Sequence, residues 1–105
     1  MIKFQLYKGC ISTLLLILLE RHGKMYGYEI VVKVKEMTQG DLNITEGALY
    51  PALHKLKEEG FLQDENYFVD GRLRKYYELT MQGEKEVLIR IEELSNFIRN
   101  LQQFI

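Results

Sequence analysis

A chain of 105 residues is long enough for one domain and too short for two. Hydrophobic residues make up 47% of it and charged residues 28%, a balance that excludes wholesale disorder. The net charge of −1 excludes a uniformly basic surface, so any contact with nucleic acid must depend on where the cations gather.

The first predicted helix covers residues 8–22, contains the apolar run 14–19 and ends at Gly23. A membrane span needs roughly 20 apolar residues, so this run predicts the centre of a soluble core and no membrane anchor. Cys10 is the single cysteine and cannot form an internal disulfide, which indicates a reducing, cytoplasmic environment.

The second helix is predicted over residues 27–38. Three of its apolar residues recur at helical spacing and are expected to share the buried face: Ile30, Val34 and Met37. Tyr26 and Tyr28, at its start, are expected to pack into the core with their hydroxyls wet, rather than to serve as stacking platforms.

The third helix is predicted to begin at Thr45 and to end at Gly60. The hydroxyl of Thr45 can cap the first turn, and Ile44 and Leu49 hold the positions of a hydrophobic staple. An inward stripe follows: Leu49, Leu53 and Leu56. Pro51 removes one backbone hydrogen bond about six residues past the cap, which predicts either a bend or a special role for that position.

A β-hairpin is predicted next, from strands over 61–69 and 72–79. Asp70-Gly71 between them is the dipeptide that a tight type I′ turn prefers. Lys75 interrupts the apolar face of the second strand, so the outer part of the hairpin is expected to project beyond the core.

The last helix is predicted to begin at Thr80, a second N-cap. Apolar residues repeat along it in steps of four and three, as in a coiled-coil seam: Val87, Ile91, Leu94, Ile98, Leu101 and Ile105. The seam is too short to stand alone, so the helix needs a partner surface.

Three helices, a hairpin and a long helix predict a mainly α fold with a small β-hairpin. The second and third helices form a helix-turn-helix and the hairpin is a wing, so the fold is a winged helix. Residues 1–80 are expected to form the winged-helix domain, with an N-terminal arm over 1–7, and residues 81–105 the dimerisation helix. The two parts make one structural unit.

Four segments, in this order and at these spacings, carry a resemblance to a known family: YGYEI at 26–30, GALYPAL at 47–53, EGFL at 59–62 and GRLRKYYELT at 71–80. Together with Gly83 they resemble the PadR family of transcriptional regulators, in particular its short members with a single C-terminal helix. The resemblance implies a homodimer that binds an operator and usually represses. It also implies a response to small aromatic or cationic effectors. Leu73 departs from the proline that the family often has there.

Residues of two elements are candidates for binding double-stranded DNA. A helix in the major groove presents its N-terminal half to the bases, and a cationic wing can reach phosphates or the minor groove. The candidates are Thr45, Gly47, Tyr50, His54, Lys55, Lys57, Arg72, Arg74 and Lys75. Ordinary alternatives stay open, because the helix positions also fit a solvated face and the wing cations also fit protection of an edge strand.

The dimer interface is expected to combine the seam with the N-terminal arm: Phe4, Leu6, Val87, Ile91, Leu94, Ile98, Leu101 and Ile105. An effector would occupy a cavity between the dimer halves, with Phe97 as the candidate aromatic because the chain has no tryptophan.

Two other classes of function are alternatives to DNA binding: a protein-interaction module and an enzyme. The near-neutral charge also fits a winged helix that binds proteins without DNA. No spacing of residues predicts a metal site, and no motif predicts a cofactor or an enzyme.

Overall fold

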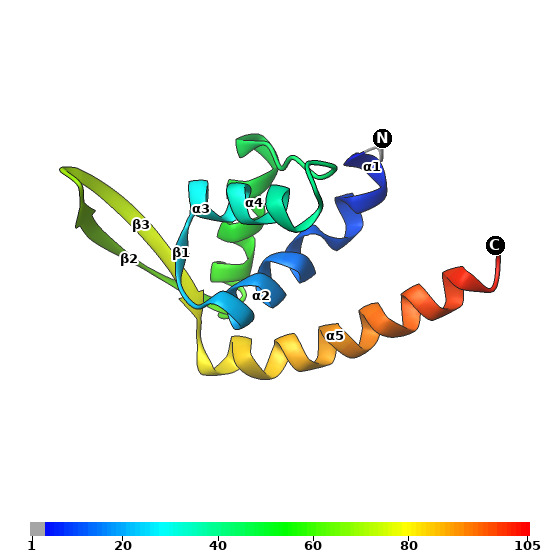
Figure 1. Ribbon diagram of the computed structural model, residues 1–105. Helices are drawn as coiled ribbons and strands as arrows, with labels where there is room; N and C mark the ends of the chain where they lie inside the picture. The colour runs from blue at the N-terminus through cyan, green and yellow to red at the C-terminus, as the bar shows by residue number, and fades with distance from the viewer. Residues whose placement is uncertain (1–3) are drawn as a thin grey trace.

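A computed structural model describes the backbone of residues 4–105 and the side chains of residues 6–105 (Figure 1). Its helices are α1 (Phe4–Tyr7), a 3₁₀ turn (Lys8–Cys10), α2 (Ile11–His22), α3 (Gly27–Met37), α4 (Glu46–Glu58) and α5 (Met81–Gln102). Its strands are β1 (Met25–Tyr26), β2 (Leu62–Val69) and β3 (Arg72–Leu79). This mainly helical fold with a small antiparallel sheet is the expected winged helix.

The helix α2 is the centre of the core. Leu15 and Leu16 are fully buried, and Leu18 and Leu19 nearly so, because neighbouring elements cover the helix on most sides. Gly23 ends the helix with a φ of 77°. The regular helix begins at Ile11, later than predicted, because a 3₁₀ turn around the poor helix former Gly9 precedes it.

The pair α3 and α4 forms the helix-turn-helix. Ile30 and Val34 of α3 are buried, but Met37 is 51% exposed, so the prediction for Met37 was wrong. Met37 is the last residue of α3, where the chain turns away from the core. The three leucines of α4 are completely buried: Leu49, Leu53 and Leu56.

Local signals fixed the start of α4 as predicted. The Thr45 hydroxyl accepts a hydrogen bond from the Ala48 amide at 3.3 Å, and Ile44 is buried as the staple requires. The helix continues through Pro51 to Glu58.

The sheet has the strand order β1-β3-β2. Asp70 and Gly71 both have positive φ, at 51° and 75°, as a type I′ turn requires. The strand β1 was not predicted, because two residues are too short to show an alternating pattern. It pairs only with Tyr76 and Tyr77 of β3, so the outer part of the hairpin has two strands and projects from the body as the wing (Figure 1).

The helix α5 begins in the core and leaves it. Thr80 caps it by accepting from the Gly83 amide at 3.0 Å, and Val87 is 1% exposed against the core. Its second half runs away from the other helices to the C-terminus (Figure 1). Among residues 4–105, no helix combines the length and apolarity needed to cross a membrane.

Candidate nucleic-acid interface

The residues of α4 that are predicted to contact DNA bases are exposed on its outer flank. Thr45, Gly47, Tyr50 and His54 are all exposed, opposite the buried leucine stripe. A methyl group built at Gly47 would have only the Thr45 hydroxyl within 4 Å, at 3.9 Å. The backbone at Gly47 is therefore open to the close approach of a ligand.

Tyr50 connects α4 to the start of α3. A methyl group built at Gly27 would collide with the Tyr50 hydroxyl, so this ring lies directly against the backbone where α3 begins. Tyr50 nevertheless remains 44% exposed. The absence of a side chain at Gly27 thus sets the position of an exposed tyrosine on the candidate interface.

Gly27→Ala should displace Tyr50 and weaken DNA binding about tenfold, which corresponds to roughly 1.4 kcal/mol. The melting temperature should change little, because the colliding atom is the far end of a side chain that can move into solvent. A DNA titration and a thermal melt of the same preparation would check this. Gly9→Ala, where the added methyl meets nothing within 4 Å, is the control; equal affinities for the two variants would contradict the role of Gly27.

Two of the predicted α4 side chains are engaged by carboxylates of the protein itself. The Lys57 ammonium lies 2.8 Å from a carboxylate oxygen of Asp64, and His54 Nε2 lies 2.9 Å from Glu58. The hydrogen bond to Asp64 raises the pKa of Lys57 above its ordinary value. Lys57 therefore joins α4 to β2 as a permanent cation whose charge is partly neutralised, while Lys55 is exposed.

The two faces of the wing differ in what covers them. Side chains alternate along β3, so Leu73, Lys75 and Tyr77 share one face with their partners on β2. Asp64, the partner of Tyr77, carries the ion pair with Lys57. This face is therefore turned toward α4. Arg72, Arg74 and Tyr76 lie on the opposite face of the strand.

A ladder of aromatic and cationic side chains stiffens that opposite face. Tyr76 makes edge-to-face contacts with Tyr26 at 5.2 Å and with Tyr67 at 5.3 Å between ring centroids. The Arg74 guanidinium lies 4.2 Å above the Tyr26 ring, and the Lys24 ammonium lies 4.3 Å from the Tyr67 ring centre. Each aromatic contact is worth about 0.5–1.5 kcal/mol, so the ladder holds a hairpin that lies largely outside the core.

The ladder also fixes one cation of the candidate site. The Nε atom of Arg74 is buried and has no hydrogen-bond partner among the described residues. Within the same residues, Arg72, Arg74 and Lys75 form no ion pair with a carboxylate. Three cations of the wing are therefore free to bind an external anion.

A hollow of about 430 Å³ lies where α3, α4 and β3 meet. Its lining contains no carboxylate and consists of Tyr26, Gly27, Tyr28, Tyr50, Arg72, Leu73, Arg74, Lys75 and Tyr77. Backbone phosphates of a nucleic acid suit such a surface, because arginine, lysine and tyrosine donors are the usual phosphate contacts. The hollow brings Tyr50 together with the three wing cations, whereas the other predicted α4 residues do not line it.

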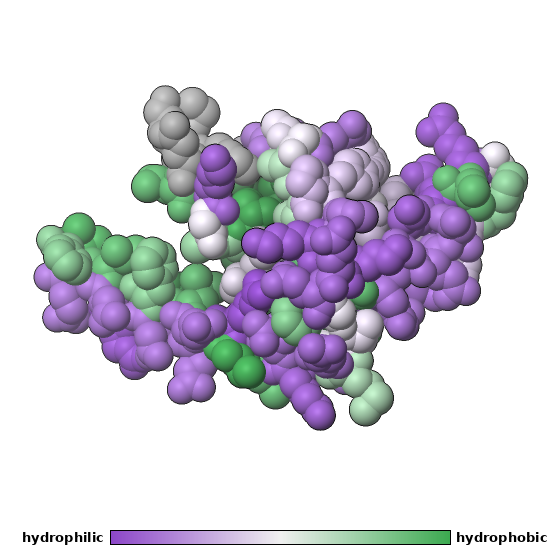
Figure 2. Space-filling view, turned by 180° about the vertical axis from the view of Figure 1, so that it is seen from behind, coloured by the Kyte–Doolittle hydropathy of each residue, from purple (hydrophilic) through white to green (hydrophobic). Residues whose placement is uncertain are grey.

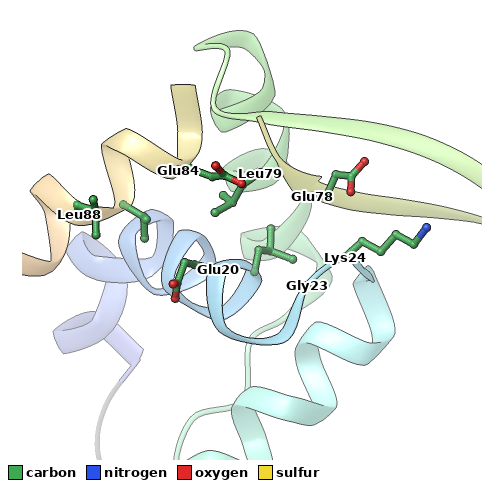
Figure 3. Close-up of a pocket in the computed structure, with 9 residues that line it drawn as sticks. Glu20, Gly23, Lys24, Glu78, Leu79, Glu84 and Leu88 are labelled. Atoms are coloured by element: carbon green, nitrogen blue, oxygen red, sulfur yellow. The ribbon is translucent and has the colours of Figure 1, made fainter. Parts of the chain in front are cut away.

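A second hollow has the opposite electrostatic character (Figure 3). Its volume is about 420 Å³, and Glu20, Glu78 and Glu84 line it beside apolar side chains of α2, β3 and α5. The one cation of its lining, Lys24, extends to the same side as Glu78 and away from Glu20 in Figure 3, and it donates to the Tyr67 hydroxyl. Three carboxylates repel phosphate, so the candidate interface is the hollow beside α4 alone.

Comparison with known proteins identifies this arrangement. The model of the PadR-like family of transcriptional regulators matches residues 14–88, which include α3, α4 and the whole wing. The chain belongs to the PadR-like family. It is therefore a transcriptional regulator and not an enzyme.

Solved structures similar to this PadR-like chain share its fold over nearly the whole length. A transcriptional regulator of Clostridium thermocellum has a TM-score of 0.86 at 28% identity, covering 96% of this chain and 98% of the other. A Streptococcus mutans protein has a TM-score of 0.77 at 34% identity, covering 90% and 84%. A PadR family regulator of Clostridium difficile has a TM-score of 0.76 at 29% identity, covering 90% and 97%.

One curated relative matches a shorter stretch. The transcriptional regulator Rv3488 of Mycobacterium tuberculosis is 39% identical over 49 residues, which are 47% of this chain and 46% of that protein. The match thus spans about half the length of the curated relative.

Two tyrosines of the PadR-like chain contribute differently from the sequence-based expectation. Tyr26 is half-buried and packs in the ladder, where it also holds Arg74, instead of in the core as predicted. Tyr28 is 67% exposed and lines the hollow, so the prediction of core packing for Tyr28 was wrong. The side chain of Tyr28 starts at the edge of the candidate interface because it is the second residue of α3.

The predicted dimerisation residues fall into two groups along α5. Val87 is buried in the core, and Ile91 packs against it, so α2 and its neighbours already cover this part of the seam. Leu94 is half-buried. The exposed part of the seam is Ile98, Leu101 and Ile105. Leu6 is 77% exposed, and the side chain of Phe4 lies outside the described residues.

Proposed function

We propose that this PadR-like regulator is a homodimer that binds a pseudo-palindromic operator in double-stranded DNA and represses transcription. Each protomer places the outer flank of α4 in the major groove, and the wing crosses the neighbouring backbone. The observation that supports this proposal most is the cationic hollow, where Arg72, Arg74 and Lys75 lie unpaired beside Tyr50 of α4.

The apolar surface of α5 supports the homodimer. Beyond Leu94, large hydrophobic side chains are about half exposed or more in the single chain: Phe97, Ile98, Leu101, Phe104 and Ile105. Figure 2 shows apolar groups along one side of this projecting arm and hydrophilic groups along the other. A second copy of the same helix supplies the matching apolar side, as a coiled-coil seam requires.

A further hollow supports a small-molecule effector. It has a volume of about 400 Å³, and Leu6, Cys10, Leu94 and Phe97 line it together with Arg90 and Glu93. A partner helix packed on α5 would close this hollow into a cavity with apolar walls and both signs of charge. A small aromatic or cationic compound fits such a lining, and its binding at the dimer seam would release the operator.

Salt dependence gives the most direct test. Each phosphate contact contributes about one unit to the slope of log affinity against log salt concentration. Lys75→Ala should therefore weaken binding to every DNA sequence and reduce the slope by about one, measured on an operator selected from a random pool. Lys85→Ala, on exposed α5, is the control and should change neither value.

Two results would contradict the proposal. Failure of the random pool to yield any enriched sequence would favour a protein-binding winged helix. An unchanged slope in Lys75→Ala would remove the wing from the interface, even if the protein binds DNA.

A further inference from the structure

The tip of the wing carries an apolar pair that no other side chain of residues 6–105 covers. Phe68 and Leu73 are direct cross-strand partners and are 75% and 65% exposed. Figure 2 shows apolar groups at the end of the wing, at the side opposite the α5 arm. Polar side chains at both positions would protect an exposed hairpin tip from aggregation better than this apolar pair does.

The pair lies on the face of the wing that turns toward α4. Leu73 shares that face with Lys75 and Tyr77, and Phe68 shares it with Asp64. The 2.8 Å ion pair between Asp64 and Lys57 fixes α4 on the same side. Phe68 and Leu73 therefore lie on the side of the wing where α4 lies.

The cationic hollow adjoins this pair, because Leu73 lines it together with Tyr50 of α4. A sugar-phosphate strand bound in this hollow would have α4, in its groove, on one side. The wing tip would lie on the other side of the same strand. Since the two grooves of a duplex alternate across each strand, α4 in the major groove places the wing tip at the minor groove. Lys75 shares the face of the apolar pair, and Arg72 and Arg74 line the same hollow as Leu73. This positive charge fits a polyanion better than a protein core.

We propose that Phe68 and Leu73 form an apolar wedge that enters the minor groove beside the site of α4. Phenylalanine and leucine side chains in such positions part neighbouring base pairs and bend the duplex. The sequence preference of this contact is indirect, because flexible pyrimidine–purine steps open most easily. The inference rests on the DNA binding proposed above and adds a contact that is independent of charge.

The double variant Phe68→Thr/Leu73→Thr tests the wedge. We expect about tenfold weaker affinity for the selected operator, with an unchanged salt slope, because apolar contacts release no counterions. The bend, measured by energy transfer between dyes at the two ends of the operator, should decrease. Val69→Thr removes an apolar side chain on the opposite face of the wing and is the matched control.

A conservative variant and thermal melts test whether the loss of affinity arises from a loss of folding stability. Phe68→Leu/Leu73→Met keeps both side chains apolar and should retain most of the bend and affinity. All variants should melt within a few degrees of the parent protein, because the wing tip is outside the core.

Four results would overturn the inference. Unchanged affinity and bend in the threonine variant remove the wedge while the DNA-binding proposal stands. A reduced salt slope in that variant assigns the effect to displaced cations. An unchanged affinity combined with loss of a self-association detected in sedimentation assigns the pair to a protein contact. Absence of any DNA binding by the parent protein removes both proposals together.

Discussion

Ile98→Asp should convert the proposed dimer into monomers and abolish operator binding at nanomolar to micromolar protein concentrations. Ile98 is 49% exposed in the single chain and belongs to the exposed half of the seam. A carboxylate there would be buried against its own symmetry mate, and an unpaired buried charge costs roughly 3–5 kcal/mol. Sedimentation velocity would show the change in mass, and a DNA titration would show the lost affinity.

The chain offers a matched control for this variant on the same helix. Ile89 is 56% exposed and lies about two and a half turns before Ile98, which places it on the opposite side of α5. Ile89→Asp should remain dimeric and should bind DNA normally. A dimeric Ile98→Asp protein, or a monomeric Ile89→Asp protein, would contradict the position of the interface.

Gly83→Ala should cause the largest loss of stability available from a single methyl group. A Cβ atom at this buried position would overlap the backbone carbonyl of Phe61, and backbone can yield far less than a side chain. Overpacking of this kind costs about 3 kcal/mol, which outweighs the roughly 1 kcal/mol that alanine gains over glycine within a helix. The net loss of about 2 kcal/mol corresponds to a fall in melting temperature of roughly 8–16 °C.

The position of Gly83 explains why nothing nearby can adjust. Thr80 accepts from the Gly83 amide at 3.0 Å, its own hydroxyl donates to the Gly60 carbonyl at 2.6 Å, and its amide donates to the Phe61 carbonyl at 3.0 Å. Melts must be compared at one protein concentration, because the proposed dimerisation would add to stability. Gly47→Ala, where the methyl meets only one atom at 3.9 Å, is the control and should not lower the melting temperature.

Local signals in the sequence predicted the elements that depend on local chemistry. The caps at Thr45 and Thr80, the turn at Asp70-Gly71 and the buried leucine stripe of α4 are all confirmed, because each is fixed by residues within one or two turns of itself. The end of α3 was less well predicted, since the exposure of Met37 depends on where the chain leaves the core.

The candidate site was only partly predictable. The wing cations and Tyr50 were identified from charge and helical spacing, and the structure brings them to one hollow. The ladder that holds Arg74 depends on the pairing of Tyr26 with Tyr76, fifty residues apart in sequence. A periodic pattern in the sequence cannot predict such a contact. It also cannot predict the pairing of Lys57 with Asp64 across the turn at Gly60.

The division of α5 between two environments has a geometric consequence. The helix has 22 residues and is therefore about 33 Å long. Its first half packs against the core of one protomer through Gly83 and Val87, and in the proposed dimer its second half packs against the partner protomer. A single rigid rod then sets how far apart the two reading helices stand. In the proposed dimer, the spacing of half-sites that the regulator accepts would therefore depend on the length and pitch of this rod, at a distance from every residue proposed to touch a base.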